Sequence, residues 1–190
     1  MGEPLTAGVA VAGLTLLAVL LMMGGEALLS SYNATVLRKR GAVEPSGDVL
    51  ATMSWAYPLS FVAMGVEGAL TGPAPGRVIV TGLAVLGLAK ALKIWAIATL
   101  GWRWTYRVLV PPGAPLVVAG PYRVARHPNY IAVVGELVGV ALTVGAPLTG
   151  VLGVAGFGWL LRQRIAVEDR ALRPTAAASR RHDASGAGLS

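Results

Sequence analysis

The chain has 190 residues, of which 55% are hydrophobic and only 13% are charged. Soluble domains carry about 25% charged residues, so this composition excludes an ordinary soluble domain, and its apolar content excludes a disordered chain. The chain has no cysteine, which excludes disulfides, thiolate metal sites and a cysteine nucleophile. The sequence therefore predicts a membrane protein, and the net charge of +7 has to be interpreted by where the charged residues lie.

Apolar stretches in chain order predict the membrane spans. The first covers 5–29, and because no basic segment precedes it we interpret it as a retained span rather than a signal peptide. The second and third cover 49–70 and 78–100. The stretch 130–161 is too long for one span and contains Gly-Ala-Pro at 145–147, which predicts a helical hairpin with short arms.

Basic residues predict the orientation of these spans. If the spans alternate in direction, thirteen of the sixteen Lys and Arg residues lie on one side and Arg77 lies alone on the other, with two inside the third span. Basic residues are retained in the cytoplasm, so the amino terminus is expected outside and the carboxyl terminus inside. We predict an all-α polytopic membrane protein with about five transmembrane helices. Residues 1–174 would form one membrane domain and 175–190 a disordered cytoplasmic tail.

Ionisable residues inside the predicted spans are candidates for function, because burying charge in a bilayer is costly. They are Glu26, Glu67, Lys90, Lys93 and Glu136. One interpretation is ion pairing between helices, with lysines extending towards water. The other is a polar cavity open to the cytoplasm. Four of the five fall in the cytoplasmic half or near the midplane, which favours the cavity.

The predicted cytoplasmic loop 101–129 is dense in Pro, Gly and Arg, and presents Arg126 and His127 immediately before a helix. Helix amino termini favour anionic groups such as a carboxylate. Further along, adjacent carboxylates at Glu168 and Asp169 lie among four arginines. Taken alone, that segment is also typical of a charged juxtamembrane helix in which Arg164 pairs with Glu168.

Several familiar chemistries are excluded by motif. The chain has no Gly-x-Gly-x-x-Gly after a strand, no phosphate-binding loop and no His-Glu-x-x-His. Two histidines are too few for a multi-histidine metal site, and we expect no metal. Because the basic residues follow the distribution of a membrane protein, we expect no nucleic-acid partner.

Two motifs, separated by the predicted hairpin, resemble the isoprenylcysteine carboxyl methyltransferase family and its phospholipid methyltransferase relatives. That family shares Gly-x-Tyr-x-x-x-Arg-His-Pro-x-Tyr and, after a hairpin, Arg-x-x-x-Glu-Glu. The matching positions are Gly120, Tyr122, Arg126, His127, Pro128 and Tyr130, then Arg164, Glu168 and Asp169. Asp169 replaces the second glutamate, and the Tyr-rich ending of the family is missing.

A more specific resemblance covers most of the chain. Segments 37–44, 100–130 and 164–172 are similar to a bacterial subgroup found beside type III polyketide synthases, whose members methylate alkylpyrones or related phenolic lipids. The resemblance implies a multi-pass enzyme of the bacterial inner membrane with a cytoplasmic active site. It also implies functional coupling to such a synthase.

The family resemblance implies S-adenosylmethionine (SAM) as cofactor, bound by the nine motif residues. Arg126 would suit the methionine carboxylate, and Glu168 the ribose hydroxyls or the ammonium group. A membrane-embedded lipid would receive the methyl group on oxygen, with Glu136 or His127 as the candidate catalytic base. Alternatives are carboxyl methylation of a prenylated cysteine, methylation of another lipid, or a non-catalytic scaffold or small transporter. The sequence does not define the oligomeric state.

Overall fold

The computed structural model describes the backbone of residues 3–186 and the side chains of residues 6–172. The described backbone contains five α-helices, two short 3-10 helices and no named strand, which confirms the all-α prediction. The elements are α1 (Glu3–Lys39), α2 (Leu50–Thr71), α3 (Gly76–Leu100), η1 (Gly101–Arg103), η2 (Gly120–Arg123), α4 (Pro128–Val144) and α5 (Pro147–Gly186).

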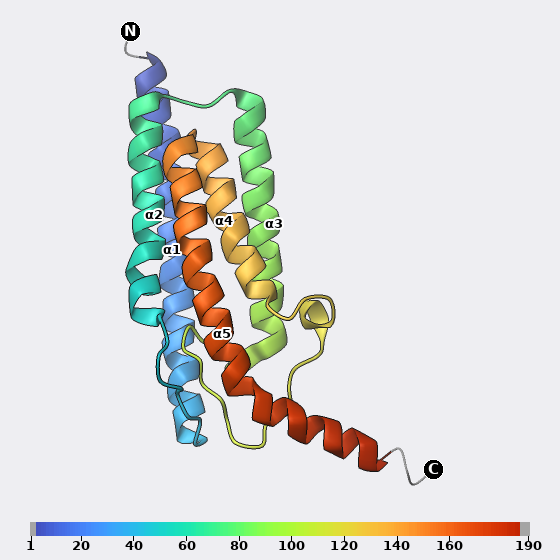
Figure 1. Ribbon diagram of the computed structural model, residues 1–190. Coiled ribbons are helices and arrows are strands. Elements are labelled where there is room, and N and C mark those ends of the chain that lie inside the picture. The colour runs from blue at the N-terminus through green and yellow to red at the C-terminus, as the bar shows by residue number, and fades with distance from the viewer. Residues whose placement is uncertain (1–2, 187–190) are drawn as a thin grey trace.

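The helices run side by side as an up-and-down bundle (Figure 1). The α1–α2 segment and the long α3–α4 loop lie at one end, drawn at the bottom, and the α2–α3 and α4–α5 turns lie at the other. We call the bottom end the loop end. The predicted cytoplasmic loop 101–129 and the carboxyl-terminal part of α5 both lie at this end.

Helices α3 and α4 pack closely against each other, and this close approach depends on glycine, which has no side chain. A Cβ added at Gly139 of α4 would lie 2.7 Å from the backbone nitrogen of Leu86 on α3. Small residues permit such close backbone approach in membrane helices. Register between α3 and α4 is fixed in this way, and it places the charged side chains of α3 opposite α4.

The predicted hairpin turn at 145–147 is confirmed. Gly145 ends α4 in the left-handed conformation, with φ 72°, and Pro147 begins α5. Glycine adopts this conformation without the steric cost of a Cβ, and proline is suited to the first turn of a helix. The turn is further held by Glu67 of α2, which accepts hydrogen bonds from the backbone nitrogens of Leu148 and Thr149 at 3.0 and 2.7 Å. Glu67 therefore caps α5 and lies at the opposite end from the loops.

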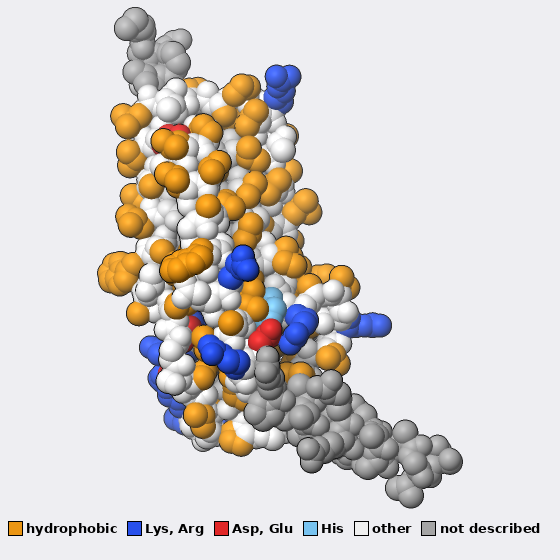
Figure 2. Space-filling model, in the orientation of Figure 1, with side chains coloured by type: hydrophobic (Ala, Val, Ile, Leu, Met, Phe, Trp, Pro, Cys, Tyr) orange, Lys and Arg blue, Asp and Glu red, His pale blue; other side chains and the backbone are white. Residues whose placement is uncertain are grey.

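Two helical stretches, Thr6–Lys39 and Gly76–Arg103, are long and apolar enough to cross a membrane, and Pro128–Val144 is a shorter apolar helix. Hydrophobic side chains cover the upper part of the visible face, whereas Lys and Arg gather mainly near the loop end (Figure 2). These features are compatible with a membrane protein. The number of spans and their orientation stay predictions.

The backbone of α5 is helical to Gly186. The division into a membrane domain over 1–174 and a tail over 175–190 stays a prediction. Residues 187–190 lie outside the described part of the chain.

Candidate active site

A cavity of about 1010 Å³ opens at the loop end of the bundle. It lies at the upper limit of the ~300–1,000 Å³ usual for small-molecule sites. One part of its wall is apolar and lies between helices, and includes Met53, Val133, Phe157 and Leu161. The other part is polar and contains seven of the predicted site residues: Tyr122, Arg126, His127, Tyr130, Arg164, Glu168 and Asp169.

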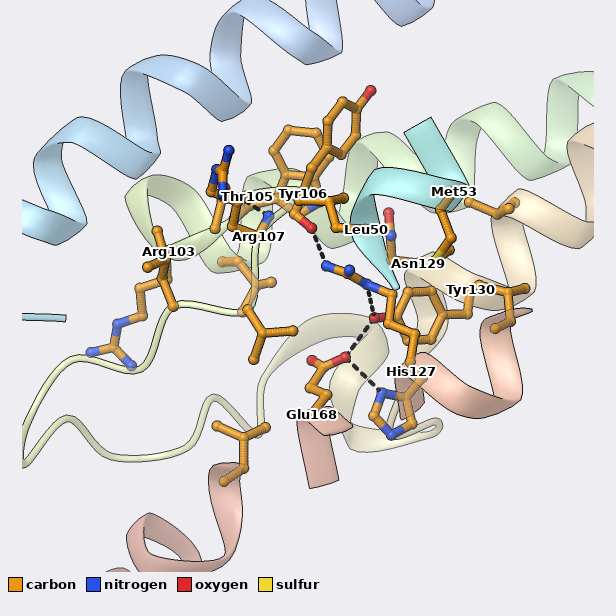
Figure 3. Close-up of a pocket in the computed structure, with 18 of the residues that line it drawn as sticks. Leu50, Met53, Arg103, Thr105, Tyr106, Arg107, His127, Asn129, Tyr130 and Glu168 are labelled. Carbon is orange, nitrogen blue, oxygen red and sulfur yellow. Dashed lines mark hydrogen bonds and ion pairs between the residues drawn. The ribbon is translucent and has the colours of Figure 1, made fainter. Parts of the chain in front are cut away.

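His127 lies between the two carboxylates of α5. Its Nε2 is 3.2 Å from Asp169 Oδ1, and its Nδ1 is 3.7 Å from Glu168 Oε2. The ring stacks on Tyr130, with centroids 5.4 Å apart, and the four side chains converge because His127 directly precedes α4. Arg126 Nη2 also contacts Asp169, at 3.1 Å. Figure 3 shows His127 and Glu168 pointing towards each other across the polar wall.

Tyr130 and Arg164 connect this group to the rest of the bundle. The Tyr130 hydroxyl donates to Glu168 Oε2 at 2.6 Å and accepts from Arg164 Nε at 3.1 Å. Arg164 Nη1 donates to both oxygens of Asp48, at 2.7 and 2.8 Å, and Nη2 donates to the backbone oxygen of Tyr106. Arg164 and Glu168 are therefore linked through the Tyr130 hydroxyl rather than as the simple helix pair that was the alternative. Figure 3 shows Tyr130 beside Glu168.

Two of the predicted cofactor residues do not line the cavity. Gly120 has φ +52°, and a Cβ there would lie 2.5 Å from Thr99 Oγ1 and 3.1 Å from Trp95 Nε1. Pro128 is fully buried in the first turn of α4. Both residues shape the loop and the helix start that carry the polar wall.

Glu136, a predicted catalytic base, does not reach the cavity wall either. Its side chain has no exposed surface and lies 3.1 Å from Lys90 Nζ and 3.2 Å from Lys93 Nζ. Glu26 of α1 contacts the same two ammonium groups, at 3.0 and 2.6 Å. We call Glu26, Lys90, Lys93 and Glu136 the ion quartet. The ion-pair interpretation of these four residues is thus correct, and of them Lys93 also lines the cavity.

Three residues that line the cavity were not predicted: Tyr57, Tyr106 and Asn129. Asp48, the partner of Arg164, was not predicted either, and it lies behind the cavity lining. Asn129 Oδ1 is buried and has no hydrogen-bond partner in the described structure, so it is an available acceptor. Asp48 could have been noticed as one of two carboxylates that follow the basic segment 38–40. Burial, reinforced by the charge of Glu26, raises the pKa of Tyr106, and this hydroxyl stays protonated at neutral pH.

The polar wall has the chemistry that SAM requires. Glu168 and Asp169 are partly exposed carboxylates that can accept from hydroxyls or an ammonium group, and Asn129 Oδ1 adds an unpaired acceptor. The side chain of Arg126 is 79% exposed, which leaves guanidinium donors free for a carboxylate. Among the described residues, no group of His, Asp and Glu is arranged to hold a metal ion.

The sequence of this region decides the family. Residues 80–174 match the model of the isoprenylcysteine carboxyl methyltransferase (ICMT) family. The match covers half of the chain and includes the polar wall contributed by α4, α5 and the loop before α4. The chain belongs to the ICMT family.

Membership of the ICMT family suggests a membrane methyltransferase. This ICMT-family chain is 30% identical over 159 residues to the uncharacterized protein YpbQ of Bacillus subtilis (strain 168), covering 83% of the chain and 95% of that relative. It is 25% identical over 145 residues to an uncharacterized protein of Haemophilus influenzae, covering 76% and 84%. No solved structure matches the chain.

Proposed function

We propose that the protein is a SAM-dependent methyltransferase that transfers a methyl group to oxygen of a membrane-embedded lipid, and that the lipid is an alkylpyrone or a related phenolic polyketide. One observation carries the proposal. A single cavity joins a polar wall, built around His127 and Glu168, to an apolar wall between helices. A water-soluble cofactor and a lipid therefore have adjoining places in one chamber.

SAM, when bound, supplies a methyl group already activated on a sulfonium. The protein residues would mainly bind and align the reactants and exclude water. Glu168 and Asp169 would accept hydrogen bonds from the cofactor, and Arg126 would bind its carboxylate. Tyr130 and Arg164 would hold Glu168 in place through the hydrogen bonds described above.

The alkyl chain of the acceptor would occupy the apolar wall and enter sideways from the bilayer. Ser54 of α2 supports this route, because it lines the cavity and is itself exposed. Met53 and Phe157 flank the inner part of the same wall. The oxygen of the lipid would then reach the cavity from the membrane side while the cofactor enters from water.

We further propose five spans in a bacterial inner membrane, with the amino terminus outside and the loop end in the cytoplasm. The excess of basic residues in the segments at the loop end supports this orientation. The active site would then face the compartment that contains SAM. Functional coupling to a type III polyketide synthase is proposed from the resemblance of segments 37–44, 100–130 and 164–172 alone.

A second candidate acceptor is a prenylated cysteine carboxylate, which is favoured by the description of the matched family. An enzyme for that acceptor should prefer a branched prenyl chain, whereas an alkylpyrone enzyme should accept straight chains. A scaffold or transporter is the alternative outside the enzyme class. Saturable SAM binding would exclude a scaffold.

The test is calorimetric titration of purified protein with SAM, together with turnover of the lipids. We expect saturable binding by the wild type and its loss in His127→Ala and Glu168→Ala, with helical folding retained. Arg170→Ala is the matched control, because Arg170 is an exposed α5 residue whose Nε donates to the Ala166 backbone oxygen. Wild-type turnover in both site variants would contradict the site assignment.

A further inference from the structure

The Tyr57 hydroxyl connects the cavity to a carboxylate that the cavity does not reach. Tyr57 of α2 lines the apolar wall, and its hydroxyl donates to Glu136 Oε2 at 2.6 Å. Glu136 has no exposed surface. Tyr57 and Lys93 both line the cavity and both contact Glu136, and of these two the Tyr57 hydroxyl is the one that can both accept and donate a proton.

The ion quartet contains two carboxylates and two ammonium groups, so its formal charges balance. Each of the two lysines contacts both Glu26 and Glu136, at 2.6 to 3.2 Å. One additional proton on a carboxylate would leave the quartet with a charge of +1. Charge buried in a low-dielectric interior is tolerated only when it is paired, so a protonated quartet is stabilised by an anion in the adjacent cavity.

The surroundings of the quartet offer one partner for each carboxylate. The Tyr57 hydroxyl donates to Glu136, and the Tyr106 hydroxyl of the α3–α4 loop donates to Glu26 Oε2 at 3.1 Å. From α5, Phe157 packs against the Tyr57 ring, with centroids 4.8 Å apart. The Tyr57–Glu136 hydrogen bond is the shorter of the two and is completely buried.

We propose that Tyr57 and Glu136 form a proton relay that deprotonates the hydroxyl group of the lipid acceptor. The acceptor O–H gives its proton to the Tyr57 oxygen while the Tyr57 proton moves to Glu136 Oε2. The acceptor oxygen keeps its electron pair and uses it to bond the methyl carbon, as the methyl–sulfur bonding pair stays on sulfur. Glu136 thus acts as the base predicted from the sequence, but through Tyr57.

This inference rests on the proposed methyltransferase function and narrows its substrate class. A relay that removes a proton benefits a phenol, whose hydroxyl is protonated at neutral pH and must ionise. A carboxylate acceptor has a pKa near 4 and is already ionised at neutral pH, so it gains nothing from the relay. The relay therefore matters for lipids that carry a weakly acidic hydroxyl group, and an acidic enol needs it less.

The first test needs no turnover. A nitrophenol with a long alkyl chain changes colour when it ionises, and it is titrated with pH while bound to the protein in detergent. We expect the pKa of the bound dye to be about one unit lower in the wild type than in Tyr57→Phe, a tenfold difference in ionisation. Equal titrations in the two proteins, or no binding of the dye to the wild type, would overturn the relay.

The second test compares two acceptors. Tyr57→Phe keeps the aromatic contacts and removes only the hydroxyl, and general-base effects are typically 10²–10⁴-fold. We expect methylation of an alkylresorcinol near pH 7 to fall about 100-fold and to recover as pH rises, while an acidic alkylpyrone changes by less than about threefold. Equal losses for both lipids, or no loss for either, would overturn the relay.

A control separates this inference from the proposed function. Tyr32→Phe removes a hydroxyl from an exposed position on α1 outside the cavity wall and should match the wild type with both lipids. SAM binding and alkylpyrone methylation by Tyr57→Phe test the function itself. If both persist while the phenol effect is missing, the relay fails and the methyltransferase stands.

Discussion

Arg164 donates from Nη1 to both carboxylate oxygens of Asp48, at 2.7 and 2.8 Å, although 116 residues separate them in the chain. Their side chains are only 5% and 9% exposed. The pair joins the segment immediately before α2 to the part of α5 that carries Glu168. It therefore fixes the polar wall of the cavity relative to the helices of the apolar wall.

Replacement of Asp48 by asparagine tests how much this ion pair contributes to the free energy of unfolding. Removing one partner of a buried ion pair leaves an uncompensated charge and typically costs about 3–5 kcal/mol. We expect Asp48→Asn to lower the free energy of unfolding in detergent by about 3 kcal/mol. Glu44→Gln is the control, because its ion pairs with Arg38 and Arg107 are more exposed and should contribute about 1 kcal/mol or less. Equal effects of the two variants would contradict this account.

Removing one positive and one negative charge from the ion quartet should destabilise the fold less than removing a single charge. Lys90→Met leaves two carboxylates with one ammonium group and should cost about 3 kcal/mol or more, whereas adding Glu26→Gln restores the balance and should recover part of that loss. The measurement is thermal unfolding of both single variants and the double variant. Strictly additive losses would show that charge balance does not control stability here.

Gly120 tests the geometry of the loop. Because its φ is +52° and a Cβ would lie 2.5 Å from Thr99 Oγ1, we expect Gly120→Ala to shift the loop and weaken SAM binding by about tenfold, or 1.4 kcal/mol. Thr99→Ala in the same chain would remove the close contact but not the backbone strain, so it should restore binding only partly. Unchanged SAM binding in Gly120→Ala would contradict the role of this glycine.

Acidification should release the contact between the α1–α2 segment and the α3–α4 loop. Burial alone would raise the pKa of Glu44, but hydrogen bonds and charge from Arg107 and Arg38 outweigh it and lower the pKa. A folded pKa below the unfolded value of about 4.3 means stability that is present above that pH and lost as pH falls through the folded pKa. The stability difference between wild type and Glu44→Gln should thus vanish in acid. A difference that persists there would refute the assignment, and unfolding at a series of pH values measures it.

The sequence was informative where a local signal exists. Gly145 and Pro147 define the hairpin turn because their backbone preferences act within a few residues. The placement of His127 beside Glu168 followed from motifs on both sides of that hairpin. Local backbone preferences, combined with one family resemblance, were sufficient to predict which residues form the polar wall.

Contacts that depend on the register between helices were not predictable. Nothing near Asp48 indicates that it pairs with Arg164, and nothing near Tyr57 indicates a hydrogen bond to Glu136. Those contacts depend on the axial positions of α2, α4 and α5 relative to one another, and close packing of side chains determines these positions. Glu136 was therefore expected in the cavity, whereas the quartet holds it behind the wall.

The most direct test is methyl transfer from labelled SAM by purified protein. The acceptors are an alkylpyrone, an alkylresorcinol and farnesylcysteine, and the products are identified by mass. We predict a labelled methyl ether of a hydroxyl-bearing lipid from the wild type and none from Glu168→Ala. If the labelled ester of farnesylcysteine is the sole product, the acceptor is a carboxylate and not a hydroxyl-bearing lipid. No labelled lipid, together with no saturable SAM binding, would contradict the shared chamber for cofactor and lipid.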